Sequence, residues 1–470
     1  MNAAAGEGDV TRTGITPARR AAYEVIRRTF EDEAWTDRAF ASAATRYELT
    51  GRDLAHARRL AYGSVQRKQT SDALLAALAR RPNRSIDAAA LAAIRLGLYE
   101  ICFADTAPDH AAVDQAVELA KAGVRRDGAP PARARAAAGF VNALLRRAAA
   151  EREQLLAPLD DSTPEGAATA LSYPLWLVEM LWAQLGAHDA RALLRAMNEP
   201  AETALRVNTL AAEPAAVADL LRAAGVQVHG PGDGGLLEPH DGLVVDLAAA
   251  PVRTRIEAGV LVPQSRGSQA VIELLDPRPG ERLLDLCAGP GIKTTAIAAR
   301  IRDRGEVVSV EVDQRRAEEV AALCERVGAR SVRIEVADAA EADLGSGYDR
   351  VLVDPPCSDL GTLASRPDAR WRKSEELIER LALLQRRILT RGARALRPGG
   401  TLLYSTCTIS AHENEAVAAS LAELVPGLVA DELGADHPGL RSRRDHRFLQ
   451  LRPDRDRTTG FFIARFRKEG

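Results

Sequence analysis

The 470-residue chain has only five cysteines, and they are widely scattered. An odd, scattered set argues against a disulfide framework. The eight histidines show no spacing to one another or to cysteine that is typical of a metal site, so no metal is expected. No stretch approaches the roughly 18 uncharged apolar residues of a membrane span, so no membrane partner is expected either.

The chain also has little net charge, −2, and therefore no overall signal for nucleic acid. With 46% apolar and 27% charged residues, the composition is that of a globular protein, and the length predicts two or three domains. The first residues, "MNAAAGEGDVTRTGI", carry acids and lack the apolar core of a signal peptide. We therefore expect a disordered tail over 1–15 and a cytoplasmic location. We also expect a monomer.

Positive charge is concentrated locally. The run "KAGVRRDGAPPARARAAAGFVNALLRR" (121–147) has seven basic residues and one acid, and "RPDARWRK" (366–373) places basic residues around Trp371. A single basic run is typical of a solvated surface. Two runs, one of them with an aromatic residue, favour contact with RNA or DNA phosphates.

The first half of the chain divides into three parts. Residues 16–150 are rich in alanine and arginine and repeat apolar residues at three- and four-residue steps, which predicts an all-helical domain opening at Pro17. The polar stretch 151–171 is interpreted as a linker. Residues 172–262 combine helical stretches with short apolar segments such as "TALRVNTL" and "GVLVPQS", and predict a small α/β module.

Residues 263–470 alternate apolar strands with helical stretches. The predicted strands are "RLLDLC", "EVVSVEV", "VRIEVAD", "YDRVLVD" and "GTLLYSTC". This alternation predicts a doubly wound parallel sheet with helices on both faces, in which ligands bind at the carboxyl ends of the strands.

The first of these strands leads into a glycine-containing turn, "LLDLCAGPGIKTT". Gly289 and Gly291 allow a sharp turn and a close approach to a ligand, and the following helix start offers free N–H donors. The next strand ends at Glu311, where a carboxylate can accept both ribose hydroxyls of a nucleoside. The third ends at Asp338, which suits an adenine amino group.

The type of nucleoside follows from what surrounds this turn. Neither the dinucleotide pattern G-x-G-x-x-G nor a complete P-loop is present. Asp285 suits a cationic ligand such as S-adenosylmethionine. The predicted cofactor-binding residues are Asp285, Cys287, Ala288, Gly289, Pro290, Gly291, Ile292, Lys293, Glu311, Asp338 and Asp354.

Two cysteines follow predicted strands: Cys357 in "VLVDPPCSDLG" and Cys407 in "YSTCTIS". Both should lie at the ligand-binding edge of the sheet. Cys102 and Cys324, in contrast, lie on apolar helix faces and are predicted to be core residues. A small apolar residue at a strand end explains either thiol alone, but not both within these motifs.

At this point the chain resembles a known family. "DLCAGPGIKT", "VLVDPPCSDLGTL", "RPDARW", "LRPGGTLLYSTCTISAHENE" and "GFFIARF" resemble the RNA 5-methylcytosine methyltransferases. The helical region, with "IRLGLYE", "DHAAVDQAVELAK" and "FVNALLRR", is similar to the NusB fold. Together they resemble the bacterial 16S ribosomal RNA cytosine-5 methyltransferases of the Sun/Fmu (RsmB) type, over nearly the whole chain beyond the first fifteen residues.

The resemblance implies a multidomain fold: a NusB-like helical RNA-binding domain (16–150), the small module (172–262) and a Rossmann-like, S-adenosylmethionine-dependent methyltransferase domain (263–470). Carbon 5 of cytosine is a poor nucleophile, and a thiolate that adds to carbon 6 activates it. The resemblance assigns that thiolate to Cys407 and release of the carbon 5 proton to Cys357. Asp354 is implied beside the cytosine amino group. The implied substrate is ribosomal RNA, 16S, with an unpaired or flipped cytosine.

The chain departs from the family pattern at four positions. Ile292 and Asp359 stand where glycine is usual, Ser265 stands where aspartate is frequent, and Thr459 stands where an acid often precedes glycine. None of these departures replaces a predicted catalytic residue.

Two other functions remain open from the sequence. "DPPC" resembles the Asp-Pro-Pro-aromatic motif of methyltransferases that act on exocyclic amines, although the aromatic is missing and Cys407 would then have no role. The second alternative is a NusB-like RNA-binding scaffold whose methyltransferase domain has decayed. The retained acids and thiols argue against it.

Overall fold

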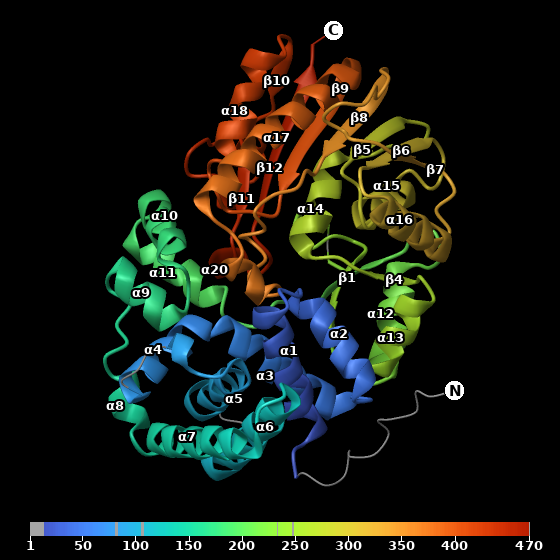
Figure 1. Cartoon of the computed structure of the whole chain (residues 1–470). Helices are drawn as coiled ribbons and strands as arrows, with labels where there is room; N and C mark the ends of the chain where they lie inside the picture. Colours follow the sequence, from blue (N-terminus) through green and yellow to red (C-terminus); the bar gives the residue numbers. More distant parts are fainter. Residues whose placement is uncertain (1–13, 80–82, 105–107, 233, 247–248, 470) are drawn as a thin grey trace. The chain divides into compact units, whose positions relative to one another are not determined.

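The computed structural model describes residues 14–79, 83–104, 108–232, 234–246 and 249–469 (Figure 1). These residues form two compact units. The helical unit contains the residues up to Asn198 together with Arg366–Arg372. The α/β unit contains Glu199–Ser365 and Lys373 to the C-terminus. The tail expected over 1–15 lies almost wholly outside the described residues.

The helical unit confirms the all-helical prediction. Helix α1 begins at Pro17, where the Thr16 hydroxyl accepts a hydrogen bond from the Arg19 backbone N–H and caps the helix. In the same helix, Arg19 forms a buried ion pair with Glu100 at 2.6 Å. The first elements of the unit are α1 (Pro17–Glu31), α2 (Thr36–Arg46), α3 (Gly51–Gln66), α4 (Lys68–Ala79), η1 (Asn83–Ser85), α5 (Ala88–Tyr99), η2 (Glu100–Ala104), α6 (Asp109–Arg126) and α7 (Pro131–Ala150).

The unit extends beyond the expected linker. Residues 151–198 form α8 (Arg152–Leu156), α9 (Pro164–Leu171), α10 (Leu175–Leu185) and α11 (Ala187–Ala196). The Ser172 hydroxyl accepts hydrogen bonds from the backbone N–H groups of Gln69 at 3.0 Å and Thr70 at 3.4 Å. The sequence places the start of the small module at Ser172; in the structure, α10 and α11 group with the helical unit, as does α9, which packs against α4.

The segment Arg366–Arg372, which contains η3 (Pro367–Trp371), also belongs to the helical unit. Arg370 is fully buried, and its guanidinium lies 4.0 Å from the centre of the Tyr173 ring. The Trp371 indole N–H donates to the Val65 carbonyl at 2.9 Å. These two residues of the second basic run are therefore packing residues, and burial lowers the pKa of Arg370 to about 10.

The α/β unit begins with a small antiparallel sheet in the order β2-β3-β1-β4. Leu205 and Val207 of β1 point into a core shared with α12. The elements of this module are β1 (Ala204–Val207), α12 (Pro214–Ala223), β2 (Val228–His229), β3 (Gly242–Val245), α13 (Ala250–Glu257) and β4 (Leu261–Pro263).

The main sheet follows, in the order β10-β12-β9-β8-β5-β6-β7, with β11 paired to β12. Strands β5 to β9 pair in parallel, which confirms the doubly wound prediction, but β12 runs antiparallel to β9 and makes the sheet mixed. The strands are β5 (Arg282–Leu286), β6 (Glu306–Glu311), β7 (Val332–Val336), β8 (Tyr348–Val353), β9 (Leu396–Thr406), β10 (Leu428–Ala430), β11 (Leu449–Leu451) and β12 (Phe461–Lys468).

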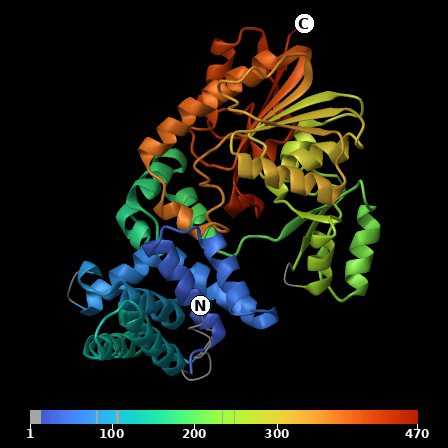
Figure 2. The same cartoon turned by 45° about the vertical axis from the view of Figure 1, so that its right-hand side comes forward.

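Helices cover both faces of this sheet. Successive strand side chains alternate between faces, so Leu284 and Leu286 pack toward α17 and α18 while Leu283 packs toward α14 and α15. Figure 2 shows α17 (orange) and α16 (dark yellow) on opposite faces. The helices are α14 (Arg266–Leu275), α15 (Ile292–Arg300), α16 (Gln314–Val327), α17 (Glu375–Ala395), α18 (Glu415–Leu424), α19 (Leu433–Asp436), η4 (Pro438–Leu440) and α20 (Pro453–Asp456). None of the described helices is long and apolar enough to cross a membrane.

Candidate active site

The turn after β5 is held by Glu311, at the end of the neighbouring strand. The Gly289 backbone N–H donates to Glu311 Oε2 at 2.9 Å. A Cβ added at Gly289 would lie 2.5 Å from that same oxygen, so any other residue would displace the Glu311 carboxylate. Gly291 has φ +96°, a left-handed conformation that favours glycine, and it caps α15. The turn is therefore fixed before any ligand arrives.

Asp285 is 1% exposed on β5, and its Oδ2 accepts a hydrogen bond from the Thr294 hydroxyl at 2.6 Å. Burial raises the pKa of Asp285 from 3.8 to about 7. A cationic ligand beside it would oppose that rise, because an opposite charge favours the carboxylate form.

The other acids at this edge differ in exposure. Glu311 is 2% exposed, and its second oxygen accepts from the Asp313 backbone N–H at 3.1 Å. Asp338 is exposed, and its Oδ1 accepts from the Ala340 backbone N–H at 2.8 Å. Since β5, β6 and β7 are neighbours in the sheet, these carboxylates lie along one edge.

The remaining residues of the turn have packing roles for their side chains. Cys287 is partly buried and Ala288 is buried. Ile292 packs against the core that includes Val320 and Leu323. What this loop offers to a ligand is its backbone. Pro290 follows Gly289 through a cis peptide bond.

Strands β8 and β9 are neighbours, and they bring the two predicted thiols together. The sulfur atoms of Cys357 and Cys407 lie 3.3 Å apart. At the end of β8, Asp354 accepts from Lys293 Nζ at 2.5 Å and from the Ser405 hydroxyl at 2.8 Å. Lys293 belongs to α15, so this chain of contacts connects the cofactor turn with the thiols.

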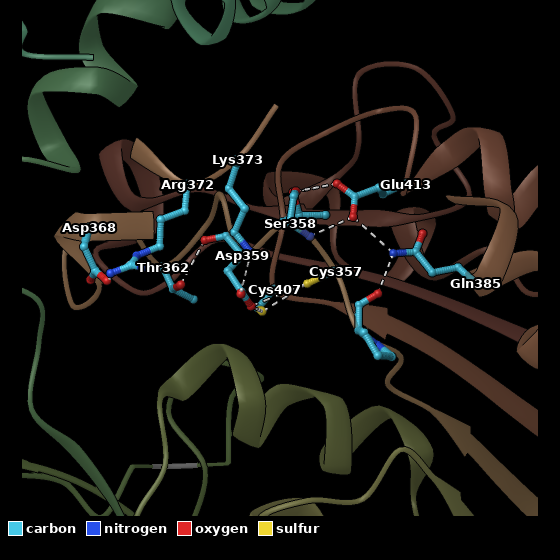
Figure 3. A network of polar contacts seen from close by, with 12 residues as sticks. Cys357, Ser358, Asp359, Thr362, Asp368, Arg372, Lys373, Gln385, Cys407 and Glu413 are labelled. Carbon is cyan, nitrogen blue, oxygen red and sulfur yellow. Dashed lines mark hydrogen bonds and ion pairs between the residues drawn. The ribbon is translucent and has the colours of Figure 1, made fainter. Parts of the chain in front are cut away.

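A third group, Asp359, contacts both thiols (Figure 3). Its Oδ1 lies 3.1 Å from the Cys407 sulfur and 3.8 Å from the Cys357 sulfur. Its Oδ2 forms an ion pair with Lys373 Nζ at 3.2 Å. The hydrogen bond to Cys357, together with burial and the nearby carboxylates, raises the pKa of Cys407 well above its usual range.

A buried network holds the loop that carries Cys357 (Figure 3). Glu413 accepts from the Ser358 backbone N–H at 2.8 Å, from the Ser358 hydroxyl, and from Gln385 Nε2 at 3.1 Å. The same Gln385 nitrogen donates to the Pro356 carbonyl at 2.9 Å. Sequence reasoning missed Glu413, Gln385 and Lys373. The sequence gives no signal for Glu413, because "TISAHENE" is as polar as a solvated loop.

A close backbone contact fixes the Cys407 loop. The Gly361 N–H donates to the Cys407 carbonyl at 3.0 Å, and the Gly460 N–H donates to the Gly361 carbonyl at 2.8 Å. A Cβ at Gly361 would lie 2.3 Å from the Gly460 carbonyl oxygen. Ser265, noted above as a departure, caps α14 by accepting from the Ser268 N–H.

Taken together, this edge of the sheet fits a nucleoside cofactor with a positive charge. The turn presents backbone N–H groups and a helix start, the acids line the ends of β5, β6 and β7, and the two thiols follow β8 and β9 on the other side of β5.

Comparison with known proteins agrees with this geometry. A family model described as "16S rRNA methyltransferase RsmB/F" matches residues 272–467, the NusB family matches 16–150, and a ferredoxin-like domain of RsmF/B-like methyltransferases matches 173–234. A probable ribosomal RNA small subunit methyltransferase B of Bacillus subtilis is 30% identical, over 97% of this chain and 99% of its own length. The chain belongs to the RsmB/F family of ribosomal RNA methyltransferases.

Other proteins are similar to this RsmB/F member over nearly all or two thirds of its length. A putative methyltransferase of Mycobacterium tuberculosis is 34% identical over 97% of this chain and 98% of its own. The crystal structure of PH0851 superposes with a TM-score of 0.79 at 25% identity, covering 97% of this chain and 99% of that one. A methyltransferase homolog from Pyrococcus horikoshii, with a TM-score of 0.56 at 26% identity, covers 66% of this chain and 99% of its own. Membership of the RsmB/F family gives the coarse function: methylation of ribosomal RNA with S-adenosylmethionine.

Proposed function

We propose that the chain transfers a methyl group to carbon 5 of a cytosine in 16S ribosomal RNA, through a covalent bond between Cys407 and carbon 6. The observation that carries this proposal is the pair of sulfur atoms 3.3 Å apart at the ends of β8 and β9. Methyl transfer to an exocyclic amine needs no thiol, whereas activation of a ring carbon needs a nucleophile that adds and later leaves.

In this mechanism the Cys407 thiol passes its proton to the Asp359 carboxylate, whose Oδ1 lies 3.1 Å away, and its sulfur forms a bond to carbon 6. The electron pair displaced from the ring double bond makes carbon 5 the nucleophile. When carbon 5 has been methylated, the Cys357 thiolate removes the carbon 5 proton. The sulfur–carbon 6 bond then breaks, and Cys407 departs as a thiolate. The separation of the two sulfurs suits groups that act on adjacent ring carbons.

Bound S-adenosyl-L-methionine supplies a methyl group on a sulfonium, which needs only a carbon nucleophile. The residues proposed to hold it are the turn from Cys287 to Lys293 with Asp285, Glu311 and Asp338. Asp354 is proposed to serve both sites, since it ends the strand between the turn and Cys407. Its carboxylate forms an ion pair with Lys293 at 2.5 Å and can accept a hydrogen bond from the cytosine amino group.

RNA phosphates are proposed to bind the helical unit through exposed arginines of the first basic run. Arg125 and Arg126 end α6, and Arg133 and Arg135 follow on α7, all exposed. The target cytosine is proposed to be unpaired or flipped out, because its carbon 6 face is covered in a stacked helix. We further propose that the protein acts in the cytoplasm as a monomer.

The test is methyl transfer from labelled S-adenosylmethionine to 16S ribosomal RNA, with the modified base identified by mass spectrometry. Wild-type protein should yield 5-methylcytosine, and Cys407→Ala should yield none. Cys357→Ala should accumulate an RNA–protein adduct that survives denaturation, because the carbon 5 proton stays in place. Full methylation by Cys407→Ala would instead support amine chemistry. Failure of the wild type to bind the cofactor would support the decayed scaffold.

A further inference from the structure

We propose that Cys357, Cys407 and Asp359 form a binding site for a thiophilic divalent cation, with Zn²⁺ as the ion that it fits. The spacing of cysteines and acids along the sequence does not predict such a site, because its ligands come from two loops that are brought together only in the folded sheet. The three ligand atoms lie within 4.8 Å of one another.

The distances are close to those of a tetrahedral zinc centre. With bonds of about 2.3 Å to sulfur and about 2.0 Å to oxygen, two sulfur ligands are separated by about 3.8 Å, and sulfur and oxygen by about 3.5 Å. The observed separations are 3.3 Å between the sulfurs and 3.1 and 3.8 Å from the sulfurs to Asp359 Oδ1. Shifts of about 0.5 Å or less would complete the geometry. A disulfide needs about 2.05 Å between the sulfurs, a larger movement.

The charges also suit a dication. Two thiolates and one carboxylate carry three negative charges, and Lys373 beside Asp359 Oδ2 neutralises one of them. A Zn²⁺ ion balances the remaining two. Each thiol gives up its proton as its bond to the metal forms, so binding releases protons and involves no oxidation. The fourth position is left for water.

Asp359 has a backbone conformation that favours glycine. Its φ is +59°, in the left-handed region where a Cβ crowds the following carbonyl oxygen. A carboxylate nevertheless stands there, with one oxygen against both thiols. Replacement by glycine therefore removes a ligand without straining the loop, which makes Asp359→Gly a clean test of the third ligand.

A bound ion would occupy the Cys407 lone pair and prevent its attack on a pyrimidine. This consequence, reversible inhibition of methyl transfer, rests on the proposed function, whereas the binding itself does not. The experiment below therefore measures metal binding without RNA or cofactor.

Metal-free full-length protein, kept reduced with a non-thiol reductant, is titrated with Co²⁺ as a spectroscopic substitute for Zn²⁺. We expect one ion per chain, with a thiolate-to-cobalt charge-transfer band and visible bands of tetrahedral intensity that Zn²⁺ abolishes. Asp359→Gly should weaken binding by about tenfold or more, and Cys407→Ser should remove the tetrahedral spectrum. The exposed acid Asp343 supplies the control Asp343→Asn, which should bind as the wild type does. Absence of the charge-transfer band, or equal affinity in Asp359→Gly, overturns the proposal.

A second measurement uses the wild type alone and does not depend on variants that fold. Zn²⁺ should slow alkylation of Cys357 and Cys407 by iodoacetamide at least tenfold, as followed by peptide mass spectrometry. Cys102 and Cys324, which lie in other parts of the fold, should react at an unchanged rate. Equal protection of all four thiols, or no protection of the pair, contradicts a site built from these residues.

Discussion

The Glu413 carboxylate accepts a hydrogen bond from the backbone N–H of Ser358 at 2.8 Å, directly after Cys357. An acid on one loop thus positions a thiol on another. Its environment contains donors: the Ser358 N–H and hydroxyl and the Gln385 amide all point at its two oxygens.

Glu413→Gln should therefore be harmful although it preserves shape. The N–H₂ group would face the Ser358 hydroxyl, and hydrogen bonds to a carboxylate, worth about 1.5–3 kcal/mol, would become neutral ones, worth about 0.5–1.5 kcal/mol. We expect a lower melting temperature and, because a displacement of about 1 Å can cost about a hundredfold in rate, a loss of methyl transfer of that order. Cofactor affinity should remain. Glu423→Gln, at an exposed position on α18, is the matched control. Normal turnover by Glu413→Gln would refute the positioning role.

Gly361→Ala should disturb the Cys407 loop. The new Cβ would lie 2.3 Å from the Gly460 carbonyl oxygen and 2.8 Å from that of Cys407, and both are backbone atoms that cannot rotate away. We expect a large fall in single-turnover methylation and a destabilisation of about 1–3 kcal/mol from overpacking. Gly439→Ala adds a methyl group where nothing lies within 4 Å and should be neutral. Equal effects of the two substitutions would show that the close contact is unimportant.

Asp285 should make stability fall as pH rises. Its pKa in the folded protein is about 7, against 3.8 unperturbed, so the folded state holds a proton that the unfolded state releases. Below about pH 4 the carboxyl is protonated in both states and does not change the free energy of unfolding. As the pH rises to about 7, burial of this group lowers the free energy of unfolding by as much as about 4 kcal/mol. Asp285→Asn should thus match the wild type at low pH and exceed its melting temperature at pH 8.

The measurement is the difference in melting temperature between wild type and Asp285→Asn, without cofactor, from pH 4 to 8. Taking the difference cancels the titration of all other groups. The exposed Asp343→Asn serves again as control and should show a flat difference. A gap that does not widen with pH would contradict burial as the cause.

Ser265 should behave as a helix cap. Its hydroxyl accepts from the Ser268 N–H at the start of α14, so Ser265→Ala should destabilise the α/β unit by about 1 kcal/mol. Ser265→Asp, which restores the residue frequent in the family, keeps an acceptor and should unfold at the wild-type temperature or above. Equal loss in both variants, measured by thermal unfolding, would exclude capping as the role of this serine.

Much of the fold could be read from the sequence. The runs ending at Asp285, Glu311 and Asp354 are apolar through their centres because both faces of their strands are covered, and each became a parallel strand as expected. The antiparallel insertion of β12 beside β9 was not foreseen. The direction of a strand in a sheet depends on the path of the segment that precedes it, and the periodicity of the strand's own residues does not predict that path.

The site was less accessible to the same reasoning. Strand ends placed Cys357 and Cys407 at one edge, but the contact of both with Asp359 depends on how two loops fold over each other. The second basic run misled for a similar reason. Arg370 looks like a phosphate ligand in sequence, and only the tertiary structure supplies the Tyr173 ring that covers it.

The return of Arg366–Arg372 to the helical unit has a consequence for how the protein can be divided. A fragment ending at Asn198 would lack the guanidinium that donates to the Ser172 carbonyl at 3.0 Å and the indole that donates to Val65. Its complement would expose a tryptophan and an unshielded arginine to water. The helical unit is thus discontinuous in the sequence. Cleavage after residue 198 therefore gives two fragments, neither of which contains all the residues of one unit and no others.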